Sequence, residues 1–219
     1  MDKRDFHFKH PTTIQVSGQT RCGKTRLVRR ILEKQLIQPF GTRIIYVYSE
    51  WQPDYDMIRE RYSGIDFEKK WRDESFDSMN PKQPNILVLD YQMGVARSSM
   101  SAADLFTKGS HHRNLTVIYL VQIVYNQGKS KRTISRNSHY SVVFRNGRDA
   151  SQFRTMVYQI CPNGGKWLVD SFTDATSVPY GYQVLDKHPS TLEDQTIITN
   201  ILPGEQYTYY INSHAKETR

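Results

Sequence analysis

One loop near the start of the chain restricts the possible folds more than any other feature. Its residues are Gly18, Gln19, Thr20, Arg21, Cys22, Gly23, Lys24 and Thr25, and they match the phosphate-loop pattern G-x-x-x-x-G-K-[ST]. In that motif backbone N–H groups surround phosphates, the lysine binds the β and γ phosphates, and the hydroxyl binds Mg²⁺. A β-rich run at 12–16 precedes the loop, and apolar residues at helical spacing follow it at 26–36. This strand–loop–helix context favours a nucleotide site over a glycine turn that only caps a helix.

Several further apolar runs have the length and composition of strands that are buried on both faces. They are 42–48, 85–89, 116–122 and 139–144. Helices are expected at 55–62, 102–112 and 150–160, and a late strand is expected at 166–169. Strands that alternate with helices predict right-handed crossovers. The predicted fold class is therefore α/β, with a mainly parallel central sheet and helices on both faces, and its ligand site lies beyond the carboxyl ends of the strands.

Two polar residues stand at the ends of predicted strands. A phosphate loop needs a carboxylate that holds the metal, and Asp90 closes the apolar run 85–89. The alternative is that Asp90 only forms a turn. Gln122 closes the run 116–122, where a glutamine can orient the attacking water or sense the γ-phosphate. Its alternative role is that of a polar residue at the edge of the sheet.

The segment 126–137 is polar and basic and is expected to be a loop without an apolar face. It contains Lys129, Lys131 and Arg132. Such a loop could supply an arginine finger to a neighbouring subunit, contact DNA phosphates or simply be solvated. The residues alone leave these three alternatives open. His111, His112 and Arg113 form another basic cluster, but no further Cys or His stands at metal-ligand spacing.

The charge balance favours a polyanionic partner. Thirty Lys and Arg residues against 22 Asp and Glu residues give a net charge of +8 and a pI near 9.4. The two cysteines, Cys22 and Cys161, are too few for a disulfide scaffold and are expected to be reduced. No run approaches the roughly 18–20 apolar residues of a membrane-spanning helix, and no signal peptide is recognised. The chain is expected in the cytosol or nucleus.

Beyond these motifs, several segments resemble the genome-packaging ATPases of Maverick/Polinton elements and adintovirus-type DNA viruses. Those proteins are similar to the poxvirus packaging ATPase and belong to the FtsK/HerA superfamily. The segments that carry the resemblance are 44–53, 105–114, 121–122, 132–135, 137–140 and 174–182. The block His111-His112-Arg113-Asn114 is more specific than the phosphate loop. The resemblance covers 12–203, the expected ATPase domain, and leaves 1–11 as an N-terminal extension and 204–219 as a C-terminal tail.

The resemblance implies an ATP-driven motor that moves double-stranded DNA into a preformed capsid. It implies a P-loop NTPase of the additional-strand (ASCE) type with strand order 5-1-4-3-2, where strands 1 to 5 are 12–16, 42–48, 85–89, 116–122 and 139–144. The expected partners are DNA, further copies of the chain in a ring, and capsid or packaging-vertex proteins, at sites of virion assembly in the host nucleus or cytoplasm or in the virion. The cofactors are ATP and Mg²⁺.

The resemblance also implies a role for each site residue. Lys24 and Thr25 are expected on the nucleotide and metal, and Asp90 on the metal. Gln122 is expected to be the polar sensor, and Arg132 the arginine that acts on the neighbouring subunit's nucleotide. Apart from the resemblance, the basic character of their segment makes Lys129 and Lys131 the candidates for contact with DNA phosphates, which a translocase must bind without regard to sequence.

The chain departs from the family at the residue after Asp90. The family usually places a second acidic residue there, whereas this sequence has Tyr91 and then Gln92. Neither is a good base at neutral pH. Glu50, after the second predicted strand, could substitute. Two other functions therefore stay open, a nucleotide-binding structural protein or decayed copy that does not hydrolyse ATP, and a P-loop nucleoside or nucleotide kinase.

Overall fold

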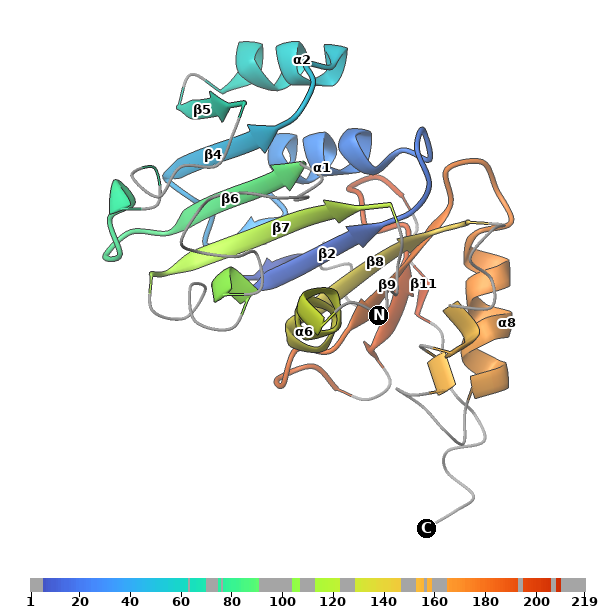
Figure 1. Cartoon of the computed structure of the whole chain (residues 1–219). Coiled ribbons are helices and arrows are strands. Elements are labelled where there is room, and N and C mark those ends of the chain that lie inside the picture. Colours follow the sequence, from blue (N-terminus) through green and yellow to red (C-terminus); the bar gives the residue numbers. More distant parts are fainter. Residues whose placement is uncertain are drawn as a thin grey trace.

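The protein has an α/β fold, in which helices pack on a central β-sheet (Figure 1). The computed structural model describes residues 6–62, 64–69, 75, 77–90, 104–106, 113–122, 129–146, 153–155, 157–158, 165–192, 195–205 and 208–209. The strands are β1 Phe8–Lys9, β2 Thr13–Ser17, β3 Ile37–Gln38, β4 Arg43–Tyr48, β5 Ile65–Glu68, β6 Asn85–Asp90, β7 Leu115–Val121, β8 Tyr140–Phe144, β9 Tyr182–Asp186, β10 Ile197–Thr199 and β11 Thr208–Tyr209. The helices are α1 Lys24–Glu33, α2 Pro53–Arg61, α6 Lys129–Asn137 and α8 Gly165–Ala175.

Nine of these strands form the main sheet, in the order β11-β10-β9-β8-β2-β7-β6-β4-β5. From β8 to β5 every neighbouring pair is parallel, whereas β9, β10 and β11 continue the sheet in antiparallel fashion. The order β8-β2-β7-β6-β4 is the predicted order 5-1-4-3-2. Strand β7 stands between the phosphate-loop strand β2 and β6, so the additional-strand topology is confirmed.

Alternate strand residues pack on opposite faces of the sheet, as the period of two in a strand requires. On one face, even-numbered residues such as Ile14 and Val88 pack with the buried side chains of α1 and α2. On the other face, Leu87 and Val117 pack with Phe106 and with Ile134 of α6, while α8 packs beside β8 and β9. Helices on both faces of the sheet are therefore confirmed.

The phosphate-loop helix α1 forms where apolar periodicity predicts it. Leu27, Val28, Ile31 and Leu32 are buried on one side of it, and Arg30 lies in its last turn, where a cation is favourable. The second predicted helix, 55–62, corresponds to α2, which begins earlier because Pro53 is suited to the first helical turn.

Two sequence predictions are wrong. The run 166–169 is not a strand but part of α8, because Leu168, Ser171 and Ala175 recur at helical spacing on its buried side. Residues 129–137 are not loop but helix α6, which buries Ile134 against the sheet. Residues 104–106, 153–155 and 157–158 are helical, and the rest of the predicted helices 102–112 and 150–160 lies outside the described residues.

Short elements at both ends of the chain were absent from the prediction. Strand β1 pairs with β3 in a separate two-stranded parallel sheet, and β11 pairs with β10 at one edge of the main sheet. Strands of two to four residues give too few alternating positions for a periodic signal. Within the described ranges, no helix has the length and apolarity needed to span a bilayer.

Candidate nucleotide site

The loop 18–23 connects the end of β2 to the start of α1 at the carboxyl edge of the parallel strands. Gly18 donates its N–H to the carbonyl of Val121 at 3.2 Å. A Cβ on Gly18 would lie 2.6 Å from Cys22 Sγ and 2.7 Å from Phe144 Cβ, so a side chain is excluded there. Gly23 precedes α1 with φ of 106°, a conformation that glycine adopts readily. Both glycines of the motif are therefore required by the shape of this loop.

Lys24, the first residue of α1, folds its side chain back over the loop. Its Nζ donates hydrogen bonds to the carbonyls of Gly18 at 2.7 Å and Gln19 at 2.9 Å. Burial lowers the pKa of Lys24, while the nearby Cys22 and Asp90 raise it. An ammonium whose oxygen partners are two neutral carbonyls can exchange them for a phosphate, whose charge-assisted hydrogen bonds are stronger.

Cys22 is the second half-buried group inside this loop. It is a free cysteine whose Sγ lies 4.0 Å from Lys24 Nζ. Burial raises the pKa of the thiol, and the charge of Lys24 opposes this rise. Cys161 lies outside the described residues.

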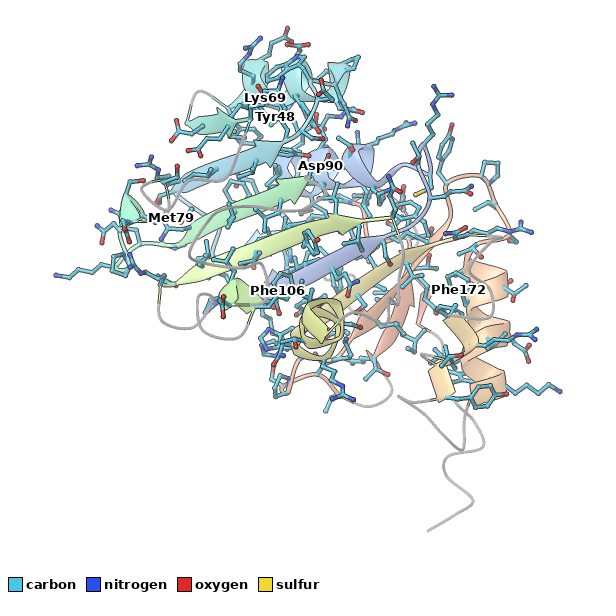
Figure 2. The ribbon with its side chains drawn as sticks, viewed as in Figure 1. Tyr48, Lys69, Met79, Asp90, Phe106 and Phe172 are labelled. Atoms are coloured by element: carbon cyan, nitrogen blue, oxygen red, sulfur yellow. The ribbon has the colours of Figure 1, made fainter. Side chains whose placement is uncertain are left out.

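Asp90 ends β6 beside the start of α1, where Figure 2 labels it. Its Oδ2 accepts a hydrogen bond from Thr25 Oγ1 at 3.1 Å. The hydroxyl and carboxylate that the sequence predicts as metal partners are thus brought together from residues 65 positions apart. Both offer oxygen, the ligand type that Mg²⁺ prefers, so the residues present fit that ion.

Two tyrosines that the sequence did not indicate complete the surroundings of Asp90. The hydroxyl of Tyr55, from α2, donates to Asp90 Oδ2 at 2.8 Å, and that of Tyr46, from β4, donates to the same oxygen at 3.3 Å. Burial, reinforced by the charge of Asp90, raises the pKa of both tyrosines well above the usual value, so both remain hydrogen-bond donors. Their ring centroids are 4.9 Å apart within an aromatic cluster. Asp90 is therefore held in place from three elements.

Gln122 and Glu50 lie at the same edge of the sheet but at different distances from the loop. Gln122 is exposed and follows Val121, which pairs with Ser17 at the end of β2. Glu50 is exposed and follows β4, whose last residue pairs with Asp90. Strands β6 and β7 separate β4 from β2. Gln122 is therefore next to the phosphate loop, whereas Glu50 is next to Asp90's strand and farther from that loop.

The remaining predicted residues are placed only in part. Lys129, Lys131 and Arg132 lie on α6, and their side chains are outside what the structure describes, as are Tyr91 and Gln92 altogether. The carbonyl of Asn137, the last residue of α6, accepts a hydrogen bond from Thr13 Oγ1 at 2.7 Å. Helix α6 therefore returns from the carboxyl edge of the sheet toward the start of β2.

No protein-family model and no curated protein sequence matches this chain. Three solved structures of genome-packaging NTPases have a similar fold. B204 of Sulfolobus turreted icosahedral virus 2 in complex with ATP-γ-S is 12% identical with a TM-score of 0.51, and the match covers 91% of this chain and 97% of that one. The same protein in complex with AMPPCP is 16% identical with a TM-score of 0.51, covering 91% and 98%.

The DNA-packaging ATPase B204 of Sulfolobus turreted icosahedral virus gives a TM-score of 0.52 at 12% identity, with 91% and 97% covered. At sequence identities this low, the similarity shows a shared fold alone. Together with the sheet order and the loop between β2 and α1, they show that the chain has the P-loop NTPase fold that these viral packaging NTPases share.

Proposed function

We propose that the chain is a subunit of an ATP-driven motor that packages double-stranded DNA into the capsid of a virus or of a Maverick/Polinton element. The observation that carries the proposal is the contact between Thr25 and Asp90, 3.1 Å apart beside the phosphate loop at the carboxyl edge of an additional-strand sheet. The B204 proteins of similar fold are named as packaging NTPases and are solved with ATP analogues. Their names support a packaging role for this chain as well.

The chain's own groups divide the work of nucleotide binding. Lys24 exchanges the carbonyls of Gly18 and Gln19 for the β and γ phosphates, and the loop's N–H groups surround the phosphate oxygens. Thr25 and Asp90 would hold Mg²⁺, which neutralises charge between the β and γ phosphates when bound. Gln122, which follows β7 beside the phosphate-loop strand β2, is assigned to orient the attacking water or to sense the γ-phosphate.

A ring explains how the site becomes complete. One subunit does not direct both its phosphate loop and its own finger at the same γ-phosphate, so Arg132 is assigned to the nucleotide of the neighbouring copy. Duplex DNA is bound through its phosphates, with Lys129 and Lys131 as contacts. The motor acts at virion assembly sites in the host nucleus or cytoplasm, with capsid or packaging-vertex proteins as partners.

One residue favours a second candidate, a nucleotide-binding structural protein that does not hydrolyse ATP. Tyr91 stands where the packaging family usually has its second acidic residue, and a tyrosine is a poor base at neutral pH. Glu50 is the alternative source of a carboxylate at this edge of the sheet. Nucleotide binding is common to both candidates, and turnover separates them.

Long duplex DNA is expected to raise the ATP turnover of the purified protein. The affinity of the protein for DNA is expected to depend steeply on salt concentration. The affinity falls with salt because neutralised DNA phosphates release counterions. Turnover with and without DNA, and log K against log salt, measure this. Replacing Lys129 and Lys131 together is expected to make the salt slope shallower.

Other outcomes select the other functions. ATP binding without turnover, with or without DNA, selects the structural protein. ATP turnover that requires a second small substrate and does not change with DNA selects a kinase. A slope near zero in the plot of log K for DNA against log salt also selects it.

Tyr55→Phe is expected to raise the Mg²⁺ concentration needed for nucleotide binding by about tenfold, the lower end of what loss of an outer partner costs a metal site. The variant removes the shortest of the three hydrogen bonds that orient Asp90. Titration of Mg²⁺ against binding of a fluorescent ATP analogue measures the shift. Affinity for the analogue without Mg²⁺ should not change.

Tyr62→Phe is the matched control for this variant. The Tyr62 hydroxyl, just beyond the end of α2, donates to the carbonyl of Leu32 and does not contact Asp90. An equal Mg²⁺ shift in both variants would mean that the hydroxyls only stabilise α2 and do not position the carboxylate.

A further inference from the structure

A pocket of about 370 Å³ opens directly beside the phosphate loop. Its walls include Gly23 and Leu27 at the start of α1, Phe144 at the end of β8, Tyr180 in the turn before β9, and Leu202 after β10. None of the side chains that bind Lys24 or Asp90 lines it. The lining combines apolar and aromatic side chains with three charged ones, Arg26, Arg30 and Glu205.

The pocket and the phosphate loop share residues. A Cβ on Gly23 would lie 3.3 Å from Tyr180 Cδ1 and 3.5 Å from Phe144 Cε1, and Phe144 also lies against Gly18. One aromatic side chain therefore borders both the first glycine of the loop and the pocket. The pocket therefore lies next to the place where phosphates would bind in the loop.

Tyr180 occupies a conformation that its residue type seldom adopts. It follows Pro179 in a turn in which the N–H of Gly181 donates to the carbonyl of Val178 at 3.0 Å, and its φ is 61°. In such a turn the third position favours glycine or asparagine. Tyr180 is nevertheless 62% exposed, so burial of its aromatic ring does not compensate for this backbone conformation. Strained residues of this kind gather at ligand sites, and Tyr180 lines this pocket.

We propose that this pocket binds the nucleoside part of a nucleoside triphosphate, with the ring of Tyr180 as a stacking surface for the base. The inference rests on the proposed function, because it requires the phosphates to lie in the loop 18–23. The volume falls within the range of roughly 300–1,000 Å³ that small-molecule sites occupy. The aromatic part of the lining suits the flat face of a base, which stacks well on an aromatic side chain. The pocket therefore distinguishes a nucleotide from a bare polyphosphate.

The experiment compares two probes by calorimetric titration, ATP and inorganic tripolyphosphate. Both reach the phosphate loop, but only ATP carries a nucleoside. Tyr180→Asn removes the ring while keeping a residue that tolerates positive φ. It is expected to weaken ATP binding about tenfold, the effect of losing one base–aromatic stack, and to leave tripolyphosphate binding unchanged. Val178→Trp, at an exposed residue of the pocket wall, fills the space and is expected to have the same selective effect.

Tyr158→Asn is the matched control, because Tyr158 is 50% exposed and does not line the pocket. It should leave both affinities as they are. The inference is overturned if wild-type protein binds ATP no better than tripolyphosphate, or if Tyr180→Asn weakens both probes equally. If the wild type binds neither probe, the proposed nucleotide function fails as well. Binding of tripolyphosphate without any effect of Tyr180→Asn and Val178→Trp on ATP refutes the pocket alone.

Discussion

Lys24→Ala is expected to weaken ATP binding by about a hundredfold or more. The ammonium makes charge-assisted hydrogen bonds to two phosphates, and each such bond contributes at least about 1.5 kcal/mol. Without nucleotide the same group donates to the carbonyls of Gly18 and Gln19, which a phosphate can replace. Titration with a fluorescent ATP analogue measures the loss. The thermal unfolding midpoint shows whether the fold is kept.

Lys34→Ala serves as the control for the lost charge. Lys34 is exposed and caps the other end of α1, about 15 Å from Lys24 at the rise of a helix. It should leave ATP affinity nearly unchanged. Unchanged affinity in Lys24→Ala itself would end the assignment of the loop 18–25 to phosphate binding.

Arg132→Ala is expected to lower ATP turnover by about 10³-fold while nucleotide affinity stays nearly intact, as for arginine fingers in general. The reason is that a finger contacts charge that develops in the transition state. Steady-state turnover and analogue binding, measured on the same preparation, separate the two effects. Arg136→Ala, one helical turn further along α6, is the matched control and should have little effect.

Mixing subunits tests whether Arg132 acts between copies. Lys24→Ala subunits combined with Arg132→Ala subunits should recover part of the activity, because some interfaces then pair an intact loop with an intact arginine. If confirmed mixed assemblies show no recovery, Arg132 is not the arginine finger. Either Arg136 then has that role, or Arg132 contributes to DNA binding instead.

The central sheet could be predicted because its strands are buried on both faces. Runs such as 85–89 and 116–122 then consist almost entirely of apolar residues, and this signal needs no knowledge of the partner strands. The phosphate loop and Asp90 were likewise visible, since each follows a strand and belongs to a pattern of fixed spacing.

The tyrosines around Asp90 could not be predicted, because their role depends on the convergence of separate elements. Tyr46 looks like an ordinary residue of a buried strand, and Tyr55 like one of a short helix. Helix α6 was not predicted from the sequence for a similar reason. Its one buried apolar side chain among the described residues, Ile134, acquires its role only through packing on the sheet.

The strands at the two edges of the main sheet affect whether copies of this chain can pair their sheets edge to edge. In the described part of the chain the two outermost strands are short, with four residues in β5 and two in β11. Strand β5 carries Asp66 and Glu68, and Asp66 is paired with Arg43 at 2.9 Å. Short edge strands, and charged side chains on β5, make poor templates for adding a strand from another molecule, so they oppose fibril-like polymerisation. In the proposed ring, contacts between copies would then be made by helices and loops, which can separate and re-form during a cycle of ATP hydrolysis.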